Sequence, residues 1–159
     1  MRARVPIMAE IIRRMTDEDV EALAAIEEAT FSMPWKPDDF REMIVKDEVV
    51  YLVVEEDGEI VGGAGIRNIL GDGEITNVVI REDRRNRGYG YKLLTRLLEE
   101  GHKLGANDYT LEVRAGNENA IALYSKLGFV SEGRRKGFYD KPKEDALILW
   151  KRAVKNSEE

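Results

Sequence analysis

The hydrophobic and polar positions along this chain follow two periodicities, one typical of β-strands and one typical of α-helices. Helix-like runs, with apolar residues recurring every three or four positions, lie at residues 17–30, 37–46, 89–104 and 119–127. Strand-like runs, rich in β-branched and aromatic residues, lie at 11–15, 49–54, 59–70, 74–80, 109–113, 129–139 and 144–151. The predicted order of elements is therefore βααβββαβαββ.

Short polar segments indicate where these elements begin and end. Thr16, followed by Asp-Glu-Asp, is an expected helix N-cap with acidic residues in the first turn. Pro37 suits the first turn of a helix, and Gly128 suits the position just beyond a helix end. The strand–helix–strand unit across 74–113 predicts parallel strands, and the flanking hairpins predict antiparallel ones. We expect an α/β fold with a mixed, mostly antiparallel sheet, helices on both faces and a ligand site where neighbouring strands diverge.

Composition limits the chemistry that is available. A chain of 159 residues suits one domain, expected at 10–152, with a flexible leader at 1–9 and a flexible tail at 153–159. There is no cysteine and only one histidine, so we expect no disulfide, no cysteine nucleophile and no metal site. No apolar run is long enough to span a membrane and no signal peptide is evident, which predicts a cytoplasmic protein. The net charge of −6 argues against a nucleic-acid partner.

The most specific segment is a basic loop between a predicted strand and a predicted helix, Arg85-Asn-Arg-Gly-Tyr-Gly90. A helix start offers free backbone N–H groups and partial positive charge to a phosphate, and glycines leave room for its approach. Arg85 and Arg87 would add charge-assisted hydrogen bonds. The segment lacks the Lys-Ser/Thr of a Walker loop, and Leu93 stands where a Rossmann fingerprint has its third glycine. Taken alone, the loop fits an exposed, flexible turn as well as a phosphate site.

Two motifs together resemble the GNAT acetyltransferases. Arg85 to Gly90 matches their R/Q-x-x-G-x-G/A motif, and Asn117 to Phe129 is similar to Asn-x-x-A-x-x-L-Y-x-x-x-G-F in the later half of that domain. The stretch from Leu111, the segment Phe31-Ser-Met-Pro-Trp35 and the segment from Arg135 to Ala146 resemble the branch that acetylates the N-terminal alanine of a ribosomal protein (RimI-like). The resemblance covers about residues 10–152.

This resemblance implies the GNAT fold, acetyl-CoA as cosubstrate and direct transfer of the acetyl group to the N-terminal α-amine of a protein, such as a ribosomal protein beginning with alanine. A lysine side chain or a small-molecule amine is the alternative acceptor. A non-catalytic acyl-CoA-binding module is less favoured, because it would need neither Glu112 nor Tyr124. The resemblance also implies cofactor contacts from Val78, Val79, Ile80, Arg85, Asn86, Arg87, Gly88, Tyr89, Gly90, Tyr91 and Asn117.

Glu112 is the candidate general base. Its position between Leu111 and Val113 on a strand predicts burial, which would raise its pKa toward a useful value. Spacing alone equally allows a side chain that faces solvent or pairs with Arg114. The resemblance favours catalysis, because it aligns Glu112 with the catalytic glutamate of that branch.

Tyr124 is the candidate acid, since the family's tyrosine at this position donates a proton to the departing sulfur; the alternative is an ordinary half-buried aromatic. Glu74 is a second candidate base, ranked below Glu112. Trp35 and Tyr139 are expected to frame the acceptor, although Trp35 could equally cover the core. His102 is expected to be solvated or to compensate the helix dipole. The loop between the last two strands is short, which leaves the acceptor's identity open.

Overall fold

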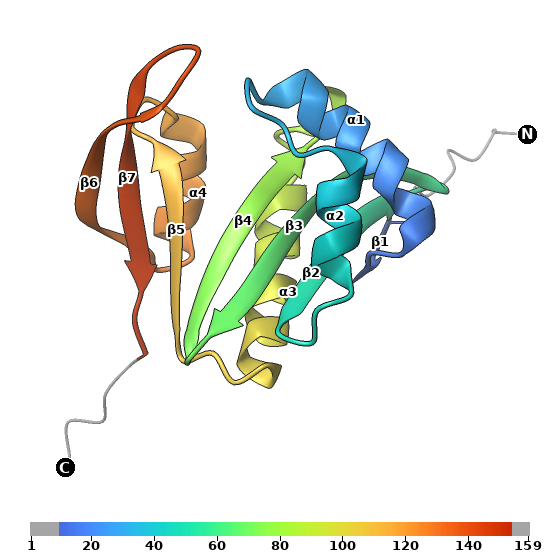
Figure 1. The fold of residues 1–159 in the computed structure, drawn as a ribbon, viewed down its shortest axis with the longest axis horizontal. Helices are drawn as coiled ribbons and strands as arrows, with labels where there is room; N and C mark the ends of the chain where they lie inside the picture. Colours follow the sequence, from blue (N-terminus) through green and yellow to red (C-terminus); the bar gives the residue numbers. More distant parts are fainter. Residues whose placement is uncertain (1–9, 154–159) are drawn as a thin grey trace, which may run out of the picture.

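The computed structural model describes residues 10–153, so the predicted leader at 1–9 and residues 154–159 of the predicted tail lie outside the described residues (Figure 1). The strands are β1 (Glu10–Arg14), β2 (Val49–Glu56), β3 (Glu59–Ile69), β4 (Asp72–Ile80), β5 (Asp108–Arg114), β6 (Val130–Tyr139) and β7 (Glu144–Lys151). The helices are α1 (Val20–Thr30), α2 (Pro37–Ile44), α3 (Tyr89–Lys103) and α4 (Glu118–Lys126). The predicted element order is confirmed, with most boundaries displaced by only one or two residues.

All seven strands form one sheet in the order β1-β2-β3-β4-β5-β7-β6. Every neighbouring pair is antiparallel except β4 and β5, which are parallel. The predicted mixed, mostly antiparallel sheet is therefore confirmed. Two tight hairpin turns set the register of β2 to β4. Both residues of each turn have positive φ, at Asp57–Gly58 and at Leu70–Gly71, as two-residue hairpins require.

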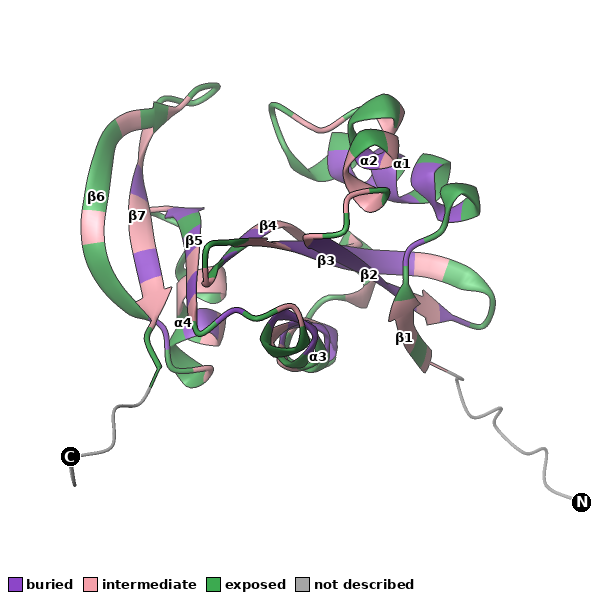
Figure 2. Ribbon diagram, turned by 60° about the horizontal axis from the view of Figure 1, so that its bottom comes forward, coloured by how far each residue is buried: buried purple, intermediate pink, exposed green. Residues whose placement is uncertain are grey.

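The helices cover both faces of the sheet, as the sequence predicts. Figure 2 shows α1 and α2 on one face and α3 and α4 on the other. Each face has its own hydrophobic core. Leu93, Leu94 and Leu97 of α3 are fully buried in the larger cluster, and Leu23 and Phe40 anchor the smaller one beneath α1 and α2. The apolar periodicity of the helices thus corresponds to the faces that they bury.

The start of α1 differs from the sequence prediction. Residues Asp17–Asp19 form a 3₁₀ turn, and the α-helix begins only at Val20. The Asp19 carboxylate accepts a hydrogen bond from the Thr16 backbone N–H at 2.8 Å and pairs with Arg13 at 2.7 Å. Thr16 is the N-cap of this turn and residues 17–19 are its acidic residues, as predicted.

The feature that positions the site is the divergence of β4 from β5. Only three residue pairs join the two strands, the last being Glu74 with Thr110 (Figure 1). Beyond this point β5 continues beside β7 as far as Arg114. Strand β4 bulges, so that Asn77 and Val78 have no partner in the register of β3. The sheet therefore opens where the sequence predicts a ligand site.

Within residues 10–153, no helix combines the length and the apolar character needed to cross a membrane. The same part of the chain holds no group of three or more His, Cys, Asp or Glu side chains placed to bind a metal ion.

Candidate active site

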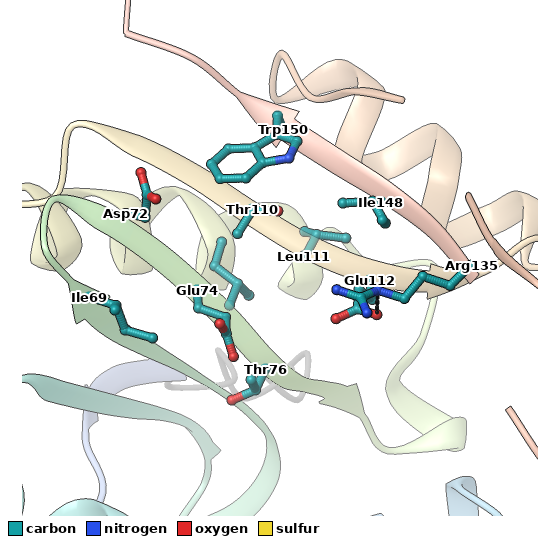
Figure 3. Close-up of a pocket in the computed structure, with 11 residues that line it drawn as sticks. Ile69, Asp72, Glu74, Thr76, Thr110, Leu111, Glu112, Arg135, Ile148 and Trp150 are labelled. Carbon is teal, nitrogen blue, oxygen red and sulfur yellow. Dashed lines mark ion pairs between the residues drawn. The ribbon is translucent and has the colours of Figure 1, made fainter. Parts of the chain in front are cut away.

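A cavity of about 370 Å³ lies where β4 and β5 diverge (Figure 3). Its walls come from both halves of the sheet: Ile69, Asp72, Glu74, Ile75 and Thr76 on one side, and Thr110, Leu111, Glu112, Arg135, Ile148 and Trp150 on the other. Three carboxylates and one guanidinium are among them. The cavity is therefore predominantly acidic and suits a cationic group.

Glu112 lies on the open face of β5. Its neighbours Leu111 and Val113 are buried toward α3, so the alternation of the strand turns Glu112 to the opposite face. The predicted burial of Glu112 is wrong, since 34% of its side chain is accessible. Its carboxylate pairs with Arg135 Nε at 3.1 Å, drawn as the dashed contact in Figure 3, and not with Arg114. This ion pair holds the candidate base at the cavity.

Arg114, at the end of β5, instead joins the loop between α1 and α2 to the loop between β6 and β7. Its guanidinium donates to Ser32 Oγ at 3.3 Å and to the Asp140 carbonyl at 2.9 Å, and it stacks 4.5 Å from the centre of the Tyr139 ring. Ser32 Oγ also donates to the Asp140 carbonyl at 3.1 Å. The α1–α2 loop and the β6–β7 loop, which lie more than a hundred residues apart in sequence, therefore meet here.

Tyr124 lies on α4 with only 7% of its surface accessible, and its ring packs edge-on against Phe129. Burial raises the pKa of the Tyr124 hydroxyl, and neighbouring Tyr139 raises it further. The pKa of Tyr139 is also raised, chiefly by burial and next by the charge of Glu112. Tyr139 thus lies within electrostatic range of both predicted catalytic groups. Tyr124 keeps its proton at neutral pH, as a proton donor must.

The two glycines of the basic loop serve different geometric needs. Gly88 caps α3 with φ +83°, and a Cβ there would meet nothing within 4 Å. A Cβ on Gly90 would lie 3.0 Å from Leu123 Cδ2, so this glycine lets α3 approach α4. The first helical bond runs from Lys92 N–H to the Gly88 carbonyl, which leaves the N–H groups of residues 89–91 available to a ligand.

The arginines of this loop are placed differently from each other. Arg85 folds back, and its Nε donates to the Ile80 carbonyl at 2.9 Å, which ties the loop to the end of β4. Arg87 is exposed and makes no hydrogen bond or ion pair with the other described residues. Arg87 is therefore the freer cation for an anionic ligand.

A buried contact that the sequence analysis missed fixes the start of α3. The Tyr89 side chain turns inward, and its hydroxyl donates a hydrogen bond to Glu56, which is only 2% exposed. Arg84 Nε binds the other Glu56 oxygen at 2.8 Å. This contact with Glu56 is the main reason that the pKa of Tyr89 rises to about 12. Tyr89 therefore presents its backbone, not its side chain, to the loop surface.

The remaining predicted residues fall into two groups. Glu74 lines the cavity, Tyr139 is half-buried at the end of β6, and Asn86 (φ +62°) and Tyr91 are exposed in or beside the basic loop. The others make contacts within the fold: Trp35 packs 5.3 Å from Phe40 over the smaller core, the Val79 side chain is buried, and Asn117 caps α4 by accepting a hydrogen bond from the Ala120 N–H at 3.2 Å. Their predicted roles in binding remain predictions. His102 is exposed in the last turn of α3, as predicted.

The structure thus combines an acidic cavity between β4 and β5 with a basic glycine loop at the start of α3. Residues 20–129 match the model of the acetyltransferase (GNAT) family, and the chain belongs to that family. It is an N-acetyltransferase.

Several curated relatives of this chain share one name. The chain is 36% identical, over 87% of its length and 93% of the relative's, to a Bacillus subtilis protein provisionally named ribosomal protein bS18-alanine N-acetyltransferase. It is 29% identical to the Escherichia coli enzyme of that name, over 87% of this chain and 94% of that one. The crystal structure of the Escherichia coli ribosomal-protein-S18-alanine N-acetyltransferase superposes with a TM-score of 0.84 at 27% identity, covering 95% of this chain and 99% of that one.

We predict that Glu56→Gln loosens the start of α3 and lowers the melting temperature at neutral pH. The hydrogen bond from Tyr89 and the charge of Arg84 lower the pKa of Glu56. A lowered carboxyl pKa stabilises the fold above the ordinary pKa and loses that effect as the pH falls. The difference in melting temperature between wild type and Glu56→Gln should therefore shrink below about pH 4. Thermal unfolding across a pH series measures it.

Glu59→Gln is the matched control, because Glu59 forms only an exposed ion pair with Arg81 at 3.0 Å. Equal losses in the two variants, or a difference that persists unchanged into acid, would contradict the anchoring role of Glu56.

Proposed function

We propose that the protein transfers the acetyl group of acetyl-CoA directly to the N-terminal α-amine of a protein, with a ribosomal protein beginning with alanine as the acceptor. The observation that carries the proposal is Glu112 on the open wall of the acidic cavity. Tyr124 does not line this cavity, but it is buried and keeps its proton. The names of the relatives support the same acceptor. Such an acceptor would place the reaction in the cytoplasm.

The basic loop fits the phosphates of acetyl-CoA. Gly88 leaves open space, the N–H groups of residues 89–91 precede the first helical bond, and Arg87 is unpaired among the described residues. Residues 78–80 begin in the bulge and lie on the β4 edge that β5 leaves uncovered, where an extended pantetheine chain can lie. Bound there, acetyl-CoA would supply an activated thioester.

The residues of this chain would then move two protons. A free α-amine arrives largely protonated, and Glu112 would accept its proton so that the nitrogen can attack. Tyr124 would donate its hydroxyl proton to the sulfur as the carbon–sulfur bond breaks, and the second proton that the nitrogen loses on becoming an amide would return to the Tyr124 oxygen. A backbone N–H of residues 78–80 would polarise the thioester carbonyl, as oxyanion-type donors do. No covalent enzyme intermediate is needed, in keeping with a chain that lacks cysteine.

Protonation favours an α-amine over a lysine. An α-amine has a pKa near 8 and a lysine near 10.4, so neutralising the lysine costs about 3 kcal/mol more. The acidic residues Asp72 and Glu74 also suit a cationic chain end. The loops joined by Arg114 border the side from which such a chain end would enter.

A peptide panel tests the acceptor. We expect acetyl-CoA to modify peptides with a free N-terminus, most rapidly those beginning with a small residue such as alanine, as read by mass spectrometry. N-terminally blocked peptides are the control. Acetylation of internal lysines, with blocked peptides reacting as fast as free ones, would contradict the proposal and support the lysine alternative.

We predict that Gly88→Val weakens acetyl-CoA binding at least tenfold, about 1.4 kcal/mol, in calorimetry. Gly88 has φ +83°, which a β-branched residue adopts only with strain, and the new side chain would occupy the open space of the loop. Gly58→Val is the matched control, because Gly58 has the same φ and equally open surroundings in the β2–β3 turn. Equal effects of the two variants on affinity would remove the loop from the site.

We predict that Glu112→Gln slows acetylation at neutral pH by about 10² to 10⁴-fold while acetyl-CoA affinity stays nearly unchanged. The loss should shrink at high pH, where the amine is neutral without help. Glu74→Gln, which changes another exposed carboxylate of the same cavity, should have the smaller effect. A loss from Glu112→Gln that is independent of pH would indicate a structural role instead.

A further inference from the structure

Helix α1 carries a buried carboxyl group that the proposed reaction does not use. Glu27 is only 2% exposed. Its Oε1 accepts hydrogen bonds from Asn77 Nδ2 at 2.6 Å and from the Trp35 backbone N–H at 3.4 Å, whereas Oε2 is buried with no hydrogen-bond partner among the described residues. Burial raises the pKa of Glu27, although the bonds from Asn77 and Trp35 oppose the rise. Burying a carboxyl group with one unpaired oxygen costs free energy, which the contacts that keep Glu27 in this position offset.

Its partner Asn77 lies in the bulge of β4 with φ +54°, a left-handed conformation that is strained for most residues other than glycine. The backbone carbonyl of Asn77 accepts a hydrogen bond from Tyr51 Oη at 3.3 Å. Burial raises the pKa of Tyr51, and the charge of Glu27 adds to the effect, so Tyr51 keeps the proton that it donates. Asn77 is thus held through its side chain by α1 and through its backbone by β2.

The same carboxyl group also contacts the loop on the acceptor side. Trp35, whose N–H reaches Glu27, follows α1 in the loop that contains Ser32, and Ser32 meets Asp140 of the β6–β7 loop. Glu27 therefore links this loop to Asn77 in the β4 bulge, directly before residues 78–80. In Figure 1, α1 lies over β3 and the end of β4, so the contact between Glu27 and Asn77 runs directly between the helix layer and the sheet.

We propose that Glu27 is a positioning residue that holds Asn77, and through it the backbone of residues 78–80, in the conformation that polarises the thioester. This inference rests on the proposed function. Glu27 touches neither substrate and acts through Asn77.

Three variants separate positioning from general core support. Glu27→Ala removes the acceptor for Asn77 and should lower kcat by about tenfold or more, with acetyl-CoA affinity within about twofold of wild type. Glu27→Gln keeps a carbonyl oxygen for Asn77 and should restore kcat to within about threefold. Ile26→Ala is the matched control, since Ile26 is the neighbouring buried residue of α1 in the same core cluster and does not contact Asn77 through a hydrogen bond. At a temperature where all variants are folded, it should leave kcat unchanged.

Asn77→Gly supplies a double-mutant cycle. Glycine adopts the same positive φ without a side chain, so the hydrogen bond between Glu27 and residue 77 is lost. In the Asn77→Gly background, Glu27→Ala should cause no further loss of kcat. Losses that multiply, or an Ile26→Ala variant as slow as Glu27→Ala, would overturn the inference.

Backbone amide NMR of residues 78–80 gives a readout that needs no acceptor. Wild type should show different amide shifts with acetyl-CoA and with CoA, Glu27→Gln should keep this difference and Glu27→Ala should lose it. If Glu27→Ala keeps the difference, the inference about Glu27 is wrong while the cofactor site stands. If wild type shows no difference, the proposed thioester site is wrong, and the inference falls with it.

Discussion

The short parallel contact between β4 and β5 is the constraint on which the site depends. Three residue pairs hold the two halves of the sheet in register, and beyond them each strand follows its own neighbours. A longer contact would pair the strand edges and leave no cavity between them, and a shorter one would leave the halves unaligned. Glu74 lies on β4 and Glu112 on β5, in separate halves of the sheet. They line one cavity because Glu74 is in the last paired position and Glu112 lies two residues beyond the partner of Glu74.

Most of the fold could be predicted because its signals are local. Turn residues such as Asp57–Gly58 and Gly71 mark the hairpins, and apolar spacing marks the buried faces of α1 and α3. At the start of α1 the N-cap Thr16 is predicted correctly, but the apolar spacing does not distinguish the 3₁₀ turn at Asp17–Asp19 from a first α-helical turn. The sequence shows that acidic residues lie in this turn, but it does not show which groups their carboxylates bind.

The candidate site was harder to predict, because its partners are distant in the sequence. The basic loop stands out in sequence by its glycines and arginines, whereas Glu112 and Tyr124 are candidates by family resemblance alone. The pairs Glu56 with Tyr89 and Glu27 with Asn77 are 33 and 50 residues apart and belong to no motif. The predicted burial of Glu112 failed because apolar neighbours on a strand point to the opposite face.

The irregular outer strand β6 also affects how the molecule behaves among its own copies. Its pairing with β7 shifts register twice, once on either side of Arg134 and Arg135, and Arg134, Arg135 and Lys136 are exposed. At the other edge of the sheet, β1 has only five residues. Bulges, basic side chains and a short edge strand each impede the addition of a strand from another chain. The strand that brings Arg135 to Glu112 therefore also protects the sheet against edge-to-edge aggregation.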